Sequence, residues 1–268
     1  MFLAEPPRTQ FDLNFQVLGF PVRVHPLFWL IGALIGYAFI RDYGAIGLVI
    51  WVFAMFVSIL LHELGHALMI RRFGRDAHVV LYAMGGLAIE GRPQSNYGNP
   101  WSLDSYTGYQ PRQRTPQEQI LISAAGPGIQ FVLAGLVIGA VYASGGTVRL
   151  LLHNYMPYVN AELGPNLAHN RHLNLLVWDL LQINIFWAIM NLLPVLPLDG
   201  GQIALQVFMQ HDPWQGTIRA LWLSVITGGI VAVLTLLAGE TYMMFLFASL
   251  AVSSYMTLLQ AGGGRRPW

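Results

Sequence analysis

The feature that most constrains this chain is an apolar run from Ala45 to Ile70 that carries three ionisable side chains near its end. About 20 apolar residues in helical conformation cross the roughly 30 Å hydrocarbon core of a bilayer, so the run predicts a membrane-spanning helix. His62, Glu63 and His66 interrupt it. Ionisable groups in a spanning helix cost about 2.5–3.5 kcal/mol each on insertion scales, and by default they indicate a functional site.

These three side chains form the pattern H-E-x-x-H. Residues four apart lie on one face of an α-helix, so the imidazoles of His62 and His66 can share a Zn²⁺ ion. Glu63 can reach a metal-bound water, whose pKa the metal lowers to roughly 7, and act as the general base. The alternative is a pair of helix histidines and a carboxylate that bond to polar neighbours. We predict a zinc hydrolase site with His62 and His66 as ligands and Glu63 as the catalytic residue.

A second polar cluster lies far along the chain, from Asn191 to Gly201. Pro194 and Pro197 cannot continue a regular helix, so we expect the helix to unwind and to present Asp199 on an Asp-Gly turn. A carboxylate there supplies a third zinc ligand and leaves the fourth position for water, which is the arrangement of catalytic zinc sites. The Asn191 amide is expected to donate hydrogen bonds to a substrate carbonyl or its oxyanion.

The composition indicates a polytopic membrane protein. The 268 residues are 55% hydrophobic and 10% charged, which excludes an ordinary soluble domain. Cysteine is absent, so any zinc must be held by histidines and carboxylates. The net charge of +1 implies no attraction to nucleic acid. The predicted fold class is an all-α polytopic membrane protein, with about six transmembrane helices and a small membrane-associated β-hairpin or sheet.

The whole chain, residues 1–268, is predicted to form a single domain. Its apolar runs place the spans at about residues 22–40, 45–70, 119–142, 173–198, 220–237 and 242–259. Alternating apolar and polar residues over 11–24 predict a short β-hairpin ahead of the membrane. Residues 91–118 are rich in Pro, Gly, Ser and Gln and predict a polar loop without a packed core. Residues 143–173 are expected to form an extramembrane loop.

Residues 78–90 directly follow the metal motif and are too short to span the bilayer as a helix. β-Branched and aromatic residues flank Gly85 and Gly86, which predicts a hairpin that dips into the bilayer beside the site. Non-helical backbone at that depth is tolerated only where protein or a water-filled cavity covers it. A free strand edge there would hold an extended substrate by β-augmentation, so both glycines are candidate substrate-binding residues. The alternative is a purely structural hairpin on the surface.

The distribution of arginine predicts the orientation. All fourteen basic residues are arginine. With six spans and a cytoplasmic N-terminus, eleven of them lie on the cytoplasmic side and three on the far side, as the positive-inside rule requires. The ends of the second and fourth spans then share the cytoplasmic side, so the active site is expected toward it. The expected location is a prokaryotic cell membrane, and no feature of the sequence indicates an oligomeric state.

His62-Glu63-Leu-Gly-His66 followed by the Asn191–Gly200 segment resembles the site-2 protease family of intramembrane zinc metalloproteases, peptidase family M50, in a compact form without PDZ or CBS domains. The resemblance includes the Gly-Gly hairpin and Gly126-Pro127-Gly128, and it extends over about residues 20–210. It implies regulated intramembrane proteolysis of transmembrane protein substrates in the lipid bilayer. It also implies zinc on His62, His66 and Asp199, with Glu63 as the base and Asn191 against the substrate. It leaves open how substrate access is gated.

Two other functions compete with this interpretation. A membrane metal transporter would use the ligands as a permeation site, but it predicts several acidic or histidine ligands along two or more spans, and the chain has one compact set. A catalytically inactive scaffold would keep the fold to bind membrane partners, and the intact Glu63 argues against it.

Overall fold

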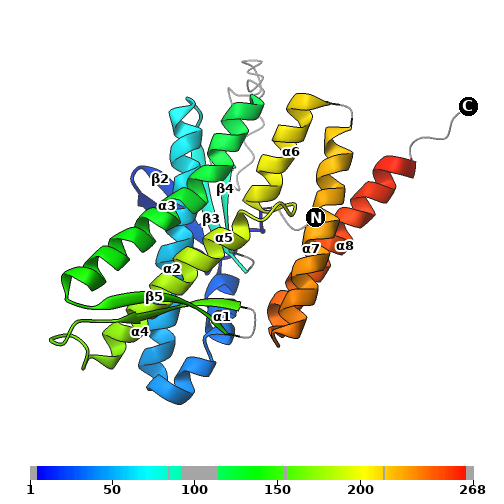
Figure 1. Ribbon diagram of the computed structural model, residues 1–268. Helices are drawn as coiled ribbons and strands as arrows, with labels where there is room; N and C mark the ends of the chain where they lie inside the picture. The colour runs from blue at the N-terminus through cyan, green and yellow to red at the C-terminus, as the bar shows by residue number, and fades with distance from the viewer. Residues whose placement is uncertain (1–4, 84, 92–113, 154–155, 214, 264–268) are drawn as a thin grey trace, which may run out of the picture.

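The computed structural model describes residues 5–83, 85–91, 114–153, 156–213 and 215–263 (Figure 1). Its elements, in chain order, are β1 (Leu13–Val17), β2 (Phe20–Val24), α1 (Pro26–Ile35), α2 (Ala38–Arg72), β3 (Ala77–Tyr82), β4 (Gly85–Glu90), α3 (Pro116–Ala143), β5 (Thr147–His153), β6 (Met156–Glu162), α4 (Arg171–Gln182), the π-helical stretch η2 (Ile183–Trp187), α5 (Ala188–Asn191), α6 (Asp199–His211), α7 (Gly216–Leu237) and α8 (Thr241–Gly263).

Helices dominate the described part of the chain. Five of them are long and apolar enough to cross a membrane: α2, α3, the continuous α4–η2–α5 segment over Arg171–Asn191, α7, and α8 over Thr241–Gln260. These five correspond to the second through sixth predicted spans. The predicted fold class, a polytopic helical membrane protein with a small sheet, is therefore confirmed, with five spanning helices among the described residues in place of about six.

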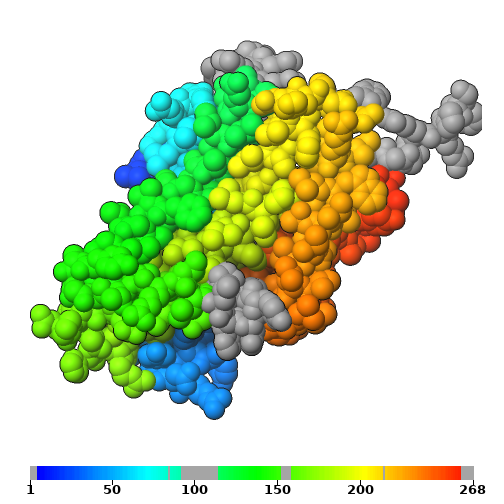
Figure 2. All heavy atoms as spheres, viewed as in Figure 1, coloured from blue at the N-terminus to red at the C-terminus, as the bar shows by residue number. Residues whose placement is uncertain are grey.

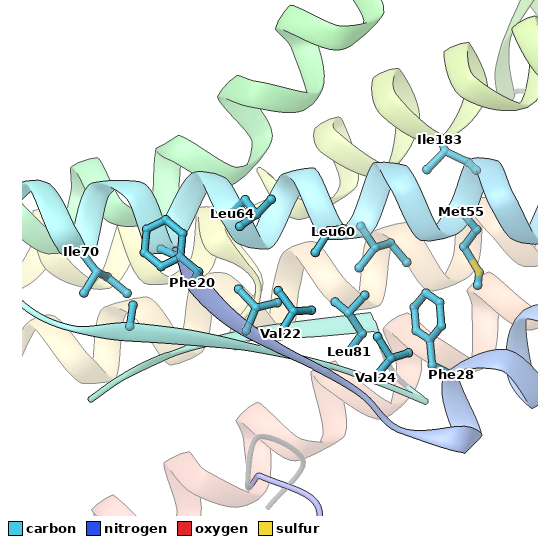
Figure 3. Close-up of a cluster of buried hydrophobic side chains, with 14 of the residues drawn as sticks. Phe20, Val22, Val24, Phe28, Met55, Leu60, Leu64, Ile70, Leu81 and Ile183 are labelled. Carbon is cyan, nitrogen blue, oxygen red and sulfur yellow. The ribbon is translucent and has the colours of Figure 1, made fainter. Parts of the chain in front are cut away.

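The prediction of a first spanning helix over residues 22–40 was wrong. Residues 22–24 belong to β2, because their backbone pairs with β3. Helix α1 begins only after His25, whose Nδ1 accepts the N–H of Leu27 at 3.2 Å, and it has ten residues. Such a helix is about 15 Å long, half of what a bilayer requires. Figure 3 shows β2 and α1 running back along α2, from beside Ile70 to beside Met55.

A four-stranded sheet with the order β1-β2-β3-β4 lies along one side of α2. β1 and β2 are antiparallel, β2 and β3 parallel, and β3 and β4 antiparallel. Both predicted hairpins are thus present, over 11–24 and over 78–90. Among the described residues β4 forms one edge of the sheet, since β3 is the one strand paired with it.

The largest apolar core lies between this sheet and α2 (Figure 3). Alternate residues of β2, including Phe20 and Val22, are fully buried against Leu64 and Ile70 of the helix. Successive side chains of a strand point to opposite faces, so Arg23 lies on the outer face. There it bonds to Glu5, to Asp12 and to backbone carbonyls of the N-terminal segment. The core thereby fixes the sheet, and β4 with it, against the helix that carries the metal motif.

α3 and α4 contact α2, and α6, α7 and α8 follow one another away from it (Figure 1). α3 packs against α2 and α6, α6 packs against α7, and α7 and α8 form an antiparallel pair (Figures 1 and 2). The fourth span is fastened to α2 by Asn184, whose Nδ2 donates to Ser58 Oγ at 2.7 Å. β5 and β6 pair where a loop was expected over 143–173. Most of the predicted polar loop over 91–118 lies outside the described residues.

Candidate metal centre

Helix α2 brings two imidazoles together, as the spacing of the motif predicts. His62 and His66 are both buried, and their Nε2 atoms lie 3.0 Å apart. The rings meet edge to face, with centroids 4.6 Å apart. Both Nε2 atoms point to the same side of the helix, because the residues are separated by one turn.

Asp199 reaches these imidazoles from the other end of the chain. Its Oδ2 lies 3.2 Å from His62 Nε2, and its Oδ1 lies 3.4 Å from His66 Nε2. One ligand atom from each of the three residues fits within 4.8 Å of the others, which makes them a potential metal-binding group. Two polar clusters that are distant in sequence therefore converge at one point.

Asp199 is held by a break between two helices. The fourth span ends at Asn191, and α6 starts at Asp199, so the carboxylate lies in the first turn of a helix and not on the Asp-Gly turn expected from the sequence. A negative charge is favourable there because of the helix dipole. A Cβ at Gly200 would lie 2.6 Å from the Leu193 carbonyl oxygen, and both Gly200 and Gly201 are buried. The two glycines therefore let the 192–196 segment fold back closely over the turn that carries Asp199.

The donor set fits a metal because the other nitrogen of each imidazole already has a partner. His62 Nδ1 lies 2.8 Å from Gln130 Oε1, and His66 Nδ1 lies 2.7 Å from the Ile122 carbonyl oxygen. An amide or carbonyl oxygen only accepts, so both Nδ1 atoms donate and both Nε2 atoms present lone pairs. The two Nε2 lone pairs and the Asp199 carboxylate are electron-rich and have no proton between them. A bound cation would neutralise their mutual repulsion. Metal-binding histidines have this same arrangement.

The distances also fit. Ligands at 2.0–2.2 Å from a tetrahedral zinc lie roughly 3.3–3.6 Å from one another. The two imidazole nitrogens lie 3.0 Å apart, and each has a different oxygen of the Asp199 carboxylate at 3.2 or 3.4 Å, close to this range. Three protein ligands leave one position open, as in catalytic zinc sites.

Gly126 of α3 makes room for the centre. A Cβ at Gly126 would collide with His66 Nε2 and lie 2.8 Å from His62 Nε2. Both imidazoles therefore pack directly on the α3 backbone, next to Pro127. Within the Gly126-Pro127-Gly128 segment, Gly126 faces the site and is required by contact.

Glu63 lies between the metal group and the sheet. It is buried, and a Cβ at Gly86 would lie 2.6 Å from its Oε1. The backbone N–H of Ala88 is within reach of the same carboxylate. Strand β4 thus covers Glu63 with backbone, and the absence of a side chain at Gly86 permits this approach.

The other predicted site residues are placed less closely. Gly85 opens β4 with a φ of 121°, a left-handed conformation that favours glycine, and nothing lies within 4 Å of its Cβ position. Asn191 is the final residue of α5 and is half-buried. Its contact with substrate remains a prediction, as does that of the two glycines.

Two residues that support the centre escaped the sequence analysis. Gln130 is fully buried and orients His62, and the Ile122 carbonyl orients His66. An amide inside an apolar helix is a signal in itself, because it costs energy unless a partner satisfies it. Gln130 lies four residues after Gly126, one turn away on the same helix, so the glycine motif pointed to the right face of α3.

Comparisons with known proteins relate the whole chain to one family. The chain matches the profile of Peptidase family M50 over residues 50–235. It is 23% identical over 227 residues to Zinc metalloprotease MJ0392 of Methanocaldococcus jannaschii, covering 84% of this chain and 52% of that protein. The chain thus spans about half the length of this curated relative. Among solved structures, Site-2 Protease from Methanocaldococcus jannaschii superposes with a TM-score of 0.53 at 18% identity, covering 92% of this chain and 95% of the other, which supports the fold.

The fold and the centre define a multi-pass membrane protein with a candidate metal site among its helices. Because the family profile covers more than half of its length, the chain belongs to peptidase family M50. The membership confirms the resemblance noted from the two motifs. Together with the His62, His66 and Asp199 group, it supports Zn²⁺ as the cofactor.

Proposed function

We propose that this chain is a zinc metalloendopeptidase that hydrolyses peptide bonds within or near the transmembrane segments of other membrane proteins. The observation that carries the proposal is that Asp199 of α6 meets His62 and His66, with Glu63 beside them, on α2, a helix long enough to span a bilayer. His62 lies about 15 Å along the axis from the end of α2 at Arg72. Such a depth favours a substrate that is itself embedded in the membrane.

The proposed roles follow from the contacts. His62, His66 and Asp199 hold zinc, which when bound supplies Lewis-acid activation of water and of the substrate carbonyl. Glu63 accepts a proton from the attacking water and returns it to the leaving amine. Gln130 keeps the His62 ring oriented through Nδ1, and the Ile122 carbonyl does the same for His66.

Strand β4 is the proposed substrate-binding edge. It has a sheet neighbour on one side, β3, so an extended peptide can add to its other side by backbone hydrogen bonds. Such a peptide would pass close to Glu63, because Gly86 lies against that carboxylate. Gly85 and Gly86 would admit it without steric hindrance, and Asn191 would donate a hydrogen bond to its carbonyl.

This geometry sets a requirement on the substrate. A transmembrane helix keeps its carbonyls in hydrogen bonds within the segment, so it must unwind before a carbonyl can reach Glu63 and the metal group. Substrates with helix-breaking residues near the scissile bond are therefore favoured. The substrate class is a membrane protein with a locally unstable transmembrane helix.

The same proposal places the active site toward the cytoplasm. The ratio of eleven arginines to three supports this orientation. β2 and α1 run along α2 in place of the predicted first span and carry the chain in the same direction. The proposed orientation of each later helix across the membrane is therefore kept. A transport function has less support, since the described residues contain a single group of three or more His, Asp or Glu side chains able to hold a metal.

The test compares wild type with Glu63→Gln in the purified, zinc-loaded full chain, reconstituted with a single-pass substrate whose transmembrane segment contains Gly or Pro. Glu63→Gln should bind zinc as wild type does, while cleavage falls at least about a hundredfold, the usual contribution of a general base. His172→Gln, at an exposed histidine near the start of α4, should change neither value. Undiminished cleavage by Glu63→Gln would exclude the mechanism. Zinc uptake into liposomes without proteolysis would favour transport instead.

A further inference from the structure

A groove lies along the contact between α2 and α3, beside the face that holds the metal group. Its volume is about 410 Å³, within the range of about 300–1,000 Å³ typical of ligand sites. From α2 it is lined by Gly65, Leu68, Met69 and Arg72. These residues follow the spacing i, i+3, i+4 and i+7, which places them on one face of the helix. The groove therefore runs along the axis of α2 for about two turns.

Helix α3 supplies the opposite wall with Ala125, Gly128 and Ile129, again at i, i+3 and i+4. The two backbones touch at its floor, since a Cβ at Gly65 would lie 2.6 Å from the Ala125 carbonyl oxygen. The groove is open above this contact: nothing lies within 4 Å of a Cβ at Gly128, and Gly128 is exposed. Figure 2 shows the end of α2, in cyan, beside α3, in green, at the surface of the molecule.

Arg72 gives one end of the groove a positive charge. Its neighbours are engaged within the protein. Arg71 donates to the Leu18 carbonyl at 2.9 Å and stacks over the Phe20 ring, and Arg75 forms ion pairs with Glu90 and Glu118. Arg72 is exposed, and the structure records no hydrogen bond or ion pair for it within the described residues. It belongs to the last turn of a spanning helix, where basic side chains meet the headgroup region.

We propose that this groove binds one phospholipid molecule, with an acyl chain between α2 and α3 and the headgroup phosphate on Arg72. The apolar walls are complementary to a hydrocarbon chain, and the Arg72 cation at the water-facing end is complementary to a phosphate. A phospholipid has both features, whereas a wholly apolar peptide lacks the phosphate. An anionic headgroup is preferred, because one arginine near the membrane surface favours anionic over zwitterionic lipid roughly fivefold. The site is separate from the Glu63 side of α2, where the proposed substrate lies.

The experiment uses the purified, delipidated full chain titrated with phosphatidylglycerol or phosphatidylcholine, with bound lipid counted by native mass spectrometry. Wild type should bind one phosphatidylglycerol about fivefold more tightly than phosphatidylcholine. Arg72→Gln should abolish this preference while leaving zinc content unchanged. Gly128→Leu, which fills the groove, should weaken both lipids at least about tenfold.

Two matched variants separate the groove from general effects on the membrane surface. Gly135→Leu places the same side chain elsewhere on α3, at another glycine with open space around it, and Arg149→Gln removes a charge from an exposed position of β5. Neither should alter lipid affinity. Undiminished lipid binding by Gly128→Leu, or an equal loss in Gly135→Leu, would overturn the proposal. So would a retained anionic preference in Arg72→Gln, or displacement of the lipid by a substrate transmembrane peptide.

Discussion

The helix pairs α2–α3 and α7–α8 both pack closely, but they use their polar groups differently. Between α2 and α3 the polar side chains bond across the interface, from His62 to Gln130 and from His66 to the Ile122 carbonyl. In α7 and α8 several hydroxyls bond back to their own helix, as Thr235 does to Val231. The first pair orients side chains, whereas the second is held by apolar packing and by small residues. The comparison indicates that hydrogen bonds across a helix interface are concentrated where side chains must be oriented to bind a metal.

One residue joins the two regions. Ser224 of α7 donates to the Ala220 carbonyl of its own helix at 2.9 Å, and it also accepts the backbone N–H of Leu196 at 3.0 Å. Leu196 lies in the break that precedes Asp199. Beside it, Val195 is fully buried in a cluster with Phe247 of α8. The α7–α8 pair therefore contributes to the metal centre by supporting the segment that carries its carboxylate.

The largest loss of zinc affinity is expected when Gly126→Ala adds one methyl group to the α2–α3 interface. Gly126→Ala forces both imidazoles away from their present positions, because the new Cβ would overlap His66 Nε2. We expect zinc affinity to fall by at least about a hundredfold, since two ligands are displaced. Gly229→Ala in α7, where nothing lies within 4 Å, should keep full zinc content by mass spectrometric metal analysis. Normal zinc binding by Gly126→Ala would show that the imidazoles do not pack on this glycine.

An intermediate effect is expected when a cross-helix partner is removed. Gln130→Leu leaves the ligands intact but deprives His62 Nδ1 of its acceptor, so zinc affinity should fall about 10- to 100-fold. Thr235→Val is the matched change in α7, because it deletes a buried hydroxyl that bonds within its own helix. Competition with a zinc chelator measures both variants. Equal affinities for Gln130→Leu and wild type would remove the distinction between the two helix pairs.

The smallest effect is expected at the link between the regions. Ser224→Ala leaves the Leu196 N–H without its acceptor and should destabilise the fold by about 1 kcal/mol. If all of this loss is transmitted to Asp199, zinc affinity falls by up to about fivefold. Ser249→Ala in α8 loses an exposed hydroxyl that donates to the Leu246 carbonyl of its own helix and should change neither value. Thermal unfolding in micelles measures the change in stability, and competition with a zinc chelator measures the change in zinc affinity.

Much of the centre was predictable because its signals are local. The four-residue spacing of His62 and His66 requires nothing beyond helix geometry, and Pro194 and Pro197 place a break before Asp199 without reference to other segments. The glycines over 78–90 likewise indicated a hairpin. These positions are specified by residue types whose conformational preferences dominate over their surroundings.

The errors arose where non-local pairing decides. Residues 22–24 end the predicted hairpin and also adjoin the apolar run after His25, and their pairing with β3 assigns them to the sheet and not to a spanning helix. The β5–β6 hairpin depends in the same way on two segments that meet in the fold. Gln130 could be recognised as an unusual residue in an apolar helix, but the identity of its partner depends on how α2 and α3 pack.

The burial of Val195 against Phe247 has a consequence for biosynthesis. A ribosome releases the segment preceding Asp199 well before α8 has been made, so the nascent chain holds every side chain of the metal group before it holds the brace behind them. The packing that supports the segment before Asp199 is therefore completed only after α8 has been made, later than any of the three metal ligands.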